Sequence, residues 1–228
     1  MAAGPLRDPA LPDLAALVWR ASRYREGTRP AGAPAWTLDE LSGRLAELSG
    51  LGAAAQLTLA FLLVREAQAL GEPAAWVSHR RSSFYPPDAA ASGVDLSALP
   101  VIFVGDAQEA ARAAAQLARS GAFGLLVVDL IGIDPAVPPA LQSRLAGLAR
   151  THDIAVLILT EKPADAPSVG SLVSFRGEAL RRRVEGPAES VPEEGAARFA
   201  CRLRVLKDKR RGPGWRHEEL CRGPAGLR

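Results

Sequence analysis

An α/β domain is expected from this sequence of 228 residues: a mostly parallel sheet flanked by helices, with antiparallel C-terminal strands and an N-terminal helical arm. Short apolar runs alternate along the chain with segments of helical periodicity, which is typical of strands joined by crossover helices. The run LLVVD at 125–129 is apolar up to a final acid, as in a central parallel strand. In FACRLRVLK at 199–207, apolar residues instead occupy alternate positions, which indicates an antiparallel extension of the sheet edge.

The first 36 residues are expected to form a helix and a linker, followed by the core domain at 37–228. Within 13–25, Leu14 and Leu17 share one helical face, Trp19 follows them, and arginines occupy the remainder. The stretch 26–36 is rich in Gly and Pro, which is typical of a linker. Two interpretations of the helix stay open: it packs on the following domain, or it docks as an arm on a neighbouring subunit.

The first half of the core domain is expected to alternate between strand and helix. Asp106 and Glu109 have the spacing of a capping box, and Gly71 and Gly121 are placed to end helices. The expected elements are strands at 45–49, 74–79 and 101–104, a helix at about 56–70, an irregular segment at 82–100, and a helix from Asp106 to Gly121.

The second half continues the alternation up to Lys162 and then changes character. Beyond that point, loop sequence and short strands indicate an antiparallel extension of the sheet. The expected elements are the strand 125–129, a helix at about 139–150, the strand 154–160, short strands at 171–175 and 180–184, and the antiparallel extension at 199–207.

Composition favours a folded protein of the reducing cytoplasm. Hydrophobic residues make up 48% of the chain, and the formal net charge is only +3, which by itself does not indicate DNA binding. Pro and Asp near the N-terminus argue against a secretory signal, and the most apolar helical segment is too short and too charged to cross a bilayer. Cys201 and Cys221 lack zinc-ligand spacing, and the histidines share no motif, so no metal is expected.

The segment from Gly50 to Thr58, GLGAAAQLT, lies where a phosphate-binding loop would stand between the first strand and its helix. Such a loop needs a lysine for the phosphates and a hydroxyl residue for magnesium. Ala55 replaces the second motif glycine, Gln56 the lysine and Leu57 the hydroxyl residue, so no nucleotide cofactor is expected. The alternative is that this segment is only a tight turn of another α/β protein.

Three segments, GRLAELSG, LARSGAFGLLVVD and RLRVLKDKRRGPGW, occur in the order and approximate spacing of the RecA core, which this chain resembles from about Leu38 to Glu219. The resemblance implies a RecA-like core in which Asp129 matches the Walker B acid. It also places Arg80 near the catalytic glutamate and Glu161 on the glutamine that senses the γ-phosphate. The segments that carry the DNA-contacting loops of RecA are shorter here, so strand exchange is not expected.

The degenerate nucleotide motifs and the ALVWRASRY helix resemble the ImuA family, accessory proteins of damage-induced translesion synthesis. This resemblance implies a non-catalytic adaptor in SOS mutagenesis that binds RecA and ImuB, the inactive Y-family polymerase homologue, and indirectly an error-prone C-family polymerase. The protein would be cytoplasmic in a bacterium and reach the nucleoid through its partners. Two alternatives stay open: a SulA-like division inhibitor that binds FtsZ, and an ATPase with an unconventional loop.

Two clusters of basic residues are candidate binding surfaces. Lys207 and Lys209 match the paired lysines that reach a neighbour's ATP in RecA filaments, and Arg210 and Arg211 extend this run. The alternative is a solvated strand end. The run Arg181-Arg182-Arg183 either protects a sheet edge by its charge or contacts DNA phosphates, and both interpretations stay open.

Overall fold

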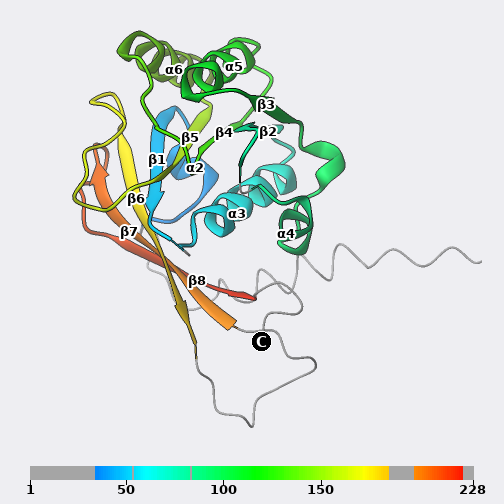
Figure 1. Cartoon of the computed structure of the whole chain (residues 1–228), viewed down its shortest axis with the longest axis vertical. Helices are drawn as coiled ribbons and strands as arrows, with labels where there is room; N and C mark the ends of the chain where they lie inside the picture. Colours follow the sequence, from blue (N-terminus) through cyan, green and yellow to red (C-terminus); the bar gives the residue numbers. More distant parts are fainter. Residues whose placement is uncertain (1–33, 53, 83, 185–197, 223–228) are drawn as a thin grey trace, which may run out of the picture. The chain divides into compact units, whose positions relative to one another are not determined.

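The computed structural model describes residues 34–52, 54–82, 84–184 and 198–222, which belong to a compact unit that begins at Pro34. An eight-stranded sheet runs through this unit in the order β3-β2-β4-β5-β1-β6-β7-β8 (Figure 1). The strands are β1 (Arg44–Gly50), β2 (Ala74–His79), β3 (Val101–Val104), β4 (Leu125–Leu130), β5 (Ala155–Glu161), β6 (Phe175–Arg183), β7 (Arg198–Asp208) and β8 (Arg216–Arg222).

The sheet is parallel from β3 to β6, and the pairs β6–β7 and β7–β8 are antiparallel. A mostly parallel sheet with antiparallel C-terminal strands is therefore confirmed. The helices are α2 (Leu38–Leu41), α3 (Gln56–Ala69), α4 (Pro86–Ala91), the short 3-10 helix η1 (Leu96–Ala98), α5 (Ala107–Arg119) and α6 (Pro139–His152).

Two apolar layers hold the helices against opposite faces of the sheet. On one face, α3 packs on side chains of the central strands such as Leu48, Trp76 and Leu157. On the other, α5 and α6 cover the alternate residues of the same strands (Figure 1). β2, β4 and β5 are buried on both faces, and they are apolar over most of their length, as the sequence indicated.

The C-terminal strands are covered on one face only. Ala179, Cys201, Leu203 and Val205 belong to the layer that contains α3. On the opposite face of β7, Arg202 and Arg204 are exposed. The alternating pattern of 199–207 therefore corresponds to a strand with one buried face, as expected.

The helix signals read from the sequence are confirmed at α5 and α3. Asp106 accepts a hydrogen bond from the backbone N–H of Glu109 (2.8 Å), and the Glu109 carboxylate accepts one from Gly105 N–H (2.7 Å). Gly71 follows the end of α3 with a φ of 76°, in the left-handed region that favours glycine.

Several expectations need correction. The segment 171–174 is not a strand, because its backbone turns against β1 and Ser174 N–H donates to Leu45 O (2.9 Å). The two short strands expected at 171–175 and 180–184 are replaced by the single strand β6. The irregular segment 82–100 contains α4 and η1, and the elements α2 and β8 were not expected. Trp36, assigned to the linker, is buried and donates its indole N–H to Leu59 O (2.8 Å).

Candidate functional site

The loop between β1 and α3 is closely packed against the end of β1. Gln56 is only 4% exposed, and its side-chain amide donates to the backbone oxygen of Thr160 at the end of β5 (3.4 Å). A Cβ on Gly50 would lie 2.7 Å from Cβ of Ala54 and 2.8 Å from the Gln56 amide carbon. The residue at the lysine position therefore lies inside the fold, against β1 and β5.

The first turn of α3 carries no cation for a triphosphate. Ala55 is the N-cap and offers no side-chain hydrogen bond, and none of the residues 56–59 is basic. Leu57, at the position of the magnesium-binding hydroxyl, is half-buried and packs against the apolar layer under α3. Backbone N–H groups at the helix start could donate to an anion, and on their own they hold it only weakly.

Asp129, the match to the Walker B acid, is fully buried at the end of β4 and holds neighbouring segments together. Its carboxylate accepts hydrogen bonds from the hydroxyls of Ser78 (3.0 Å) and Ser82 (2.7 Å) and from the backbone N–H of Ile131 (3.1 Å). His79 lies beside this network, with Nε2 2.7 Å from the Ile131 oxygen. These contacts join the ends of β2 and β4, so Asp129 has a structural role.

The other residues aligned with RecA catalytic positions do not complete a site. Glu161 is exposed at the end of β5, opposite Gly50 in the ladder with β1. Arg80 is exposed just beyond β2. Gln56 begins α3, after β1, and β5 lies between β1 and the strand β4 that carries Asp129.

A buried ionic cluster that sequence reasoning missed lies beside β1. Glu47 is fully buried and accepts hydrogen bonds from the Thr160 hydroxyl (2.9 Å) and the Val169 N–H (2.9 Å). The ammonium group of Lys162 lies 2.7 Å from the same carboxylate. Arg176 donates to the backbone oxygens of Pro163 and Ala166, so the cluster fastens the loop between β5 and β6.

Lys207 and Lys209, at the end of β7, differ in their surroundings. Lys209 is exposed, and its ammonium group donates to the backbone oxygen of Ser171 (2.9 Å). Lys207 is half-buried, and burial, together with the charges of Lys209 and Arg176, lowers the pKa of Lys207 against the opposing effect of Glu47. Among the described residues, no carboxylate lies within ion-pair distance of Lys207.

Arg210 and Arg211 lie beside Asp208, which organises the turn between β7 and β8. Asp208 has a fully buried side chain, forms a 2.6 Å ion pair with Arg44, and accepts hydrogen bonds from the N–H of Arg210 and the indole of Trp215. Burial would raise the pKa of Asp208, but the hydrogen bonds from Arg44, Arg210 and Trp215 hold it below its ordinary value. The Arg211 side chain pairs with Glu40 at 2.9 Å.

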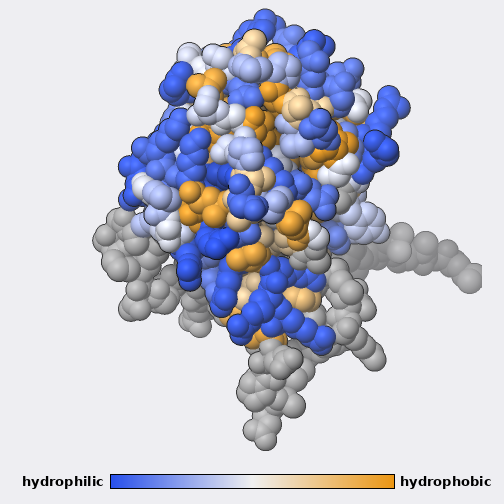
Figure 2. All heavy atoms as spheres, turned by 60° about the vertical axis from the view of Figure 1, so that its left-hand side comes forward, coloured by the Kyte–Doolittle hydropathy of each residue, from blue (hydrophilic) through white to orange (hydrophobic). Residues whose placement is uncertain are grey.

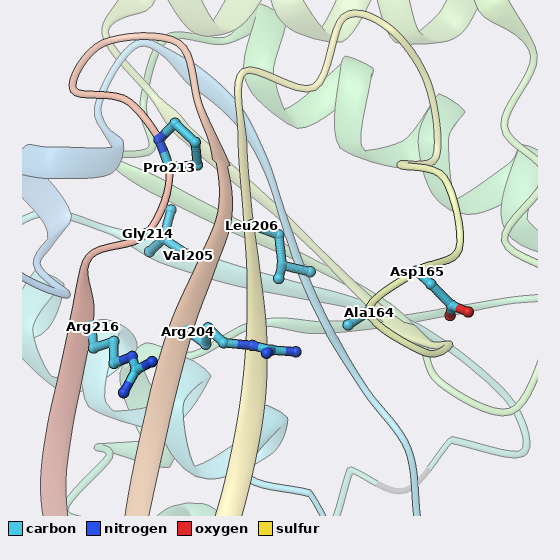
Figure 3. Close-up of a pocket in the computed structure, with 8 residues that line it drawn as sticks. All are labelled: Ala164, Asp165, Arg204, Val205, Leu206, Pro213, Gly214 and Arg216. Carbon is cyan, nitrogen blue, oxygen red and sulfur yellow. The ribbon is translucent and has the colours of Figure 1, made fainter.

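The outer face of the C-terminal strands carries a shallow pocket of about 490 Å³ (Figure 3). Arg204 and Leu206 extend from β7 toward the loop that carries Ala164 and Asp165, and Arg216 lies on the neighbouring strand. Figure 2 shows this side of the unit, with apolar atoms exposed between hydrophilic side chains. No aromatic residue lines the pocket.

The remaining expectations concern the N-terminal helix, metal binding and membrane-spanning segments. Leu14, Leu17 and Trp19 lie outside the described residues. Within the described ranges, no three His, Cys, Asp or Glu side chains come together as a group able to hold a metal ion. No helix in that part of the chain has both the length and the apolar character needed to cross a bilayer.

Comparison with known proteins adds no assignment. No protein-family model matches the chain. A search of curated proteins likewise found no match.

Proposed function

We propose that this chain is a non-catalytic adaptor with a RecA-like core, which binds RecA and ImuB in SOS-induced translesion DNA synthesis. The observation that carries the non-catalytic part is the packing of the loop after β1. Gln56, at the lysine position, is buried against Thr160, and Asp129 is engaged by Ser78, Ser82 and Ile131. A triphosphate needs a cation and a magnesium ligand at these positions.

The α/β architecture supports the RecA-like part of the proposal. Parallel strands flanked by helices on both faces continue into antiparallel C-terminal strands, which is the arrangement that the resemblance implies. The sheet and its apolar layers persist although the phosphate-binding residues are replaced. A fold kept without its catalytic residues is suited to binding other proteins.

Lys207 and Lys209 support contact with a RecA subunit. Lys207 has no carboxylate partner among the described residues, and the ammonium group of Lys209 is held by a single backbone oxygen. In the proposed complex, these lysines reach the phosphates of ATP bound to the neighbouring RecA. The adaptor would then cap a filament, because its own loop cannot hold a second nucleotide. It would be cytoplasmic and reach the nucleoid through these partners.

The test is co-purification of the tagged full chain with RecA, ImuB and FtsZ in separate experiments. We expect retention of RecA and ImuB, and about tenfold weaker retention of RecA by the variant Lys207→Ala/Lys209→Ala. The control Arg112→Ala/Arg119→Ala removes the same charge from exposed positions of α5 and should bind as the unmodified chain does. Retention of FtsZ without RecA or ImuB would favour the SulA-like alternative and refute the proposal.

A further inference from the structure

One edge of β6 is open over its second half. β1 pairs with β6 only from Phe175 to Glu178, opposite Ala46 to Ser49. β7 pairs with β6 as far as Arg183. Residues 179–183 therefore have a ladder partner on one side, and no described strand pairs with their other side. Unpaired backbone N–H and C=O groups on such an edge can pair with a further strand.

A groove lies along this open edge, which we call the β6 groove. It has a volume of about 250 Å³ and is lined by residues from β6, the loop after β1 and the loop after β5. The lining residues are Leu51, Ala54, Pro163, Ala164, Glu178, Ala179, Leu180 and Arg181. Leu51 is 57% exposed and Leu180 41% exposed, so the groove offers apolar side chains to solvent.

The open edge also carries unneutralised positive charge. Arg181, Arg182 and Arg183 are all exposed, and among the described residues no carboxylate lies within 4.0 Å of them. The Arg181 guanidinium stacks on the Phe199 ring, 3.8 Å from its centroid. The arginines of the neighbouring strand differ, because Arg202 is paired with Glu218 and Arg204 with Glu178.

These three features occur together where β1 ends and β6 continues. We propose that the open edge of β6 pairs with an extended acidic segment of a partner protein. The segment adds a strand beside residues 179–183, places an apolar side chain against Leu51 and Leu180, and presents carboxylates to the arginine run. Main-chain hydrogen bonds and side-chain pockets together are what peptide binding by strand addition requires. The inference does not depend on which protein supplies the segment.

The surroundings favour a peptide over a nucleic acid. The groove is lined by Leu, Ala and Pro, and none of its lining residues is aromatic. Binding of single strands relies on aromatic rings that stack on bases, in addition to positive charge. Backbone groups of a sheet edge are matched by another extended backbone, which a nucleic acid does not have.

The experiment uses the full chain and a fluorescein-labelled decapeptide that alternates valine and glutamate. We expect saturable binding in fluorescence anisotropy, weakened about tenfold by Arg182→Glu/Arg183→Glu. The matched control Arg112→Glu/Arg119→Glu makes the same charge change on α5 and should leave binding within about twofold. A second variant, Leu51→Asp, tests the apolar side of the groove from an exposed loop position and is also expected to weaken binding.

Two further peptides and an oligonucleotide decide between explanations. A peptide with prolines in place of the central valines keeps the charge but cannot pair as a strand, and it should not bind. A peptide with lysine in place of glutamate should not bind either. Equal binding of the proline peptide, or equal binding by the Arg182→Glu/Arg183→Glu variant, would overturn the proposal. So would tight binding of oligothymidylate with no binding of the valine-glutamate peptide, which would assign the arginines to nucleic acid.

Discussion

At the scale of one residue, Asp129, which the resemblance matches to the Walker B acid, is engaged within its own chain. Its carboxylate is surrounded by two hydroxyls and a backbone N–H of its own chain. A carboxylate that supports magnesium would keep an oxygen directed toward the phosphate site. The aspartate is therefore explained by the loops that it joins, without a nucleotide.

Replacing Asp129 by alanine should therefore lower the free energy of unfolding. Because three hydrogen-bond donors in a buried network lose their acceptor, we expect the free energy of unfolding to fall by about 3 kcal/mol. Urea denaturation without nucleotide measures this change. The control is Asp134→Ala, because Asp134 is exposed and accepts only the Ala136 N–H; its loss should be about 0.5 kcal/mol. Unchanged stability of the Asp129 variant would contradict the structural role.

The buried pair of Arg44 and Asp208 predicts a dependence of stability on pH. The pKa of Asp208 is lower in the folded protein than its ordinary value of 3.8. The stabilisation is therefore complete above that ordinary value and is lost as the pH falls through the folded-state pKa.

The change Asp208→Asn should cost about 3 kcal/mol of unfolding free energy at neutral pH, because the buried Arg44 loses its 2.6 Å partner and keeps only the longer ion pair with Glu40 (3.6 Å). In urea denaturation the difference from the unmodified protein should shrink at about pH 3. Asp165→Asn, in an exposed loop, serves as control. A difference that stays constant between the two pH values would show that Asp208 does not titrate with a lowered pKa.

The sequence predicts which chemical groups the loop after β1 lacks, but it does not predict which side chains are buried around that loop. The sequence alone shows that Ala55, Gln56 and Leu57 lack a cation and a hydroxyl. It does not reveal that Glu47, in an apparently ordinary strand, is fully buried with Lys162, because that contact joins residues far apart in the chain. Long-range ion pairs leave no periodic pattern in a single sequence.

At the scale of elements, the loop from Gly50 to Gln56 can be tested through its packing. Gly50→Ala should lower the free energy of unfolding by about 2 kcal/mol, because the added Cβ would meet Ala54 and Gln56 at less than 3.0 Å. The control is Gly147→Ala in α6, where an added Cβ would have no atom within 4 Å. This change should raise the free energy of unfolding by about 0.5 kcal/mol, because alanine favours a helix more than glycine does. Thermal and urea denaturation measure the stability of both variants. Equal changes in the free energy of unfolding for Gly50→Ala and Gly147→Ala would show that the loop is not closely packed.

Elements with strong periodicity were predictable, and those defined by tertiary contacts were not. The α5 helix has both a capping pair and an apolar face, so its start is confirmed within one residue. β8, with the sequence RHEELCR, has no alternating apolar pattern, and its pairing with β7 defines it as a strand. The segment 171–174 has apolar residues, but it is fixed as a turn by contacts with β1.

At the scale of the whole molecule, the α/β architecture followed from the sequence and the strand order did not. Alternating apolar runs indicate a parallel sheet, because crossover helices must cover its faces. The position of β1 between β5 and β6 depends on which strands pair across the domain, and no local signal encodes that choice. The open edge of β6 follows from the same order, since β1 ends at Gly50 while β6 and β7 continue together.

The proposed absence of a working nucleotide site is tested by isothermal titration of the full chain with MgATP. We expect no saturable heat at millimolar nucleotide, because Gln56 is buried against Thr160 and Asp129 is engaged within the chain. Saturable, magnesium-dependent binding that is lost in Gln56→Ala, a change outside the Asp129 network, would contradict it.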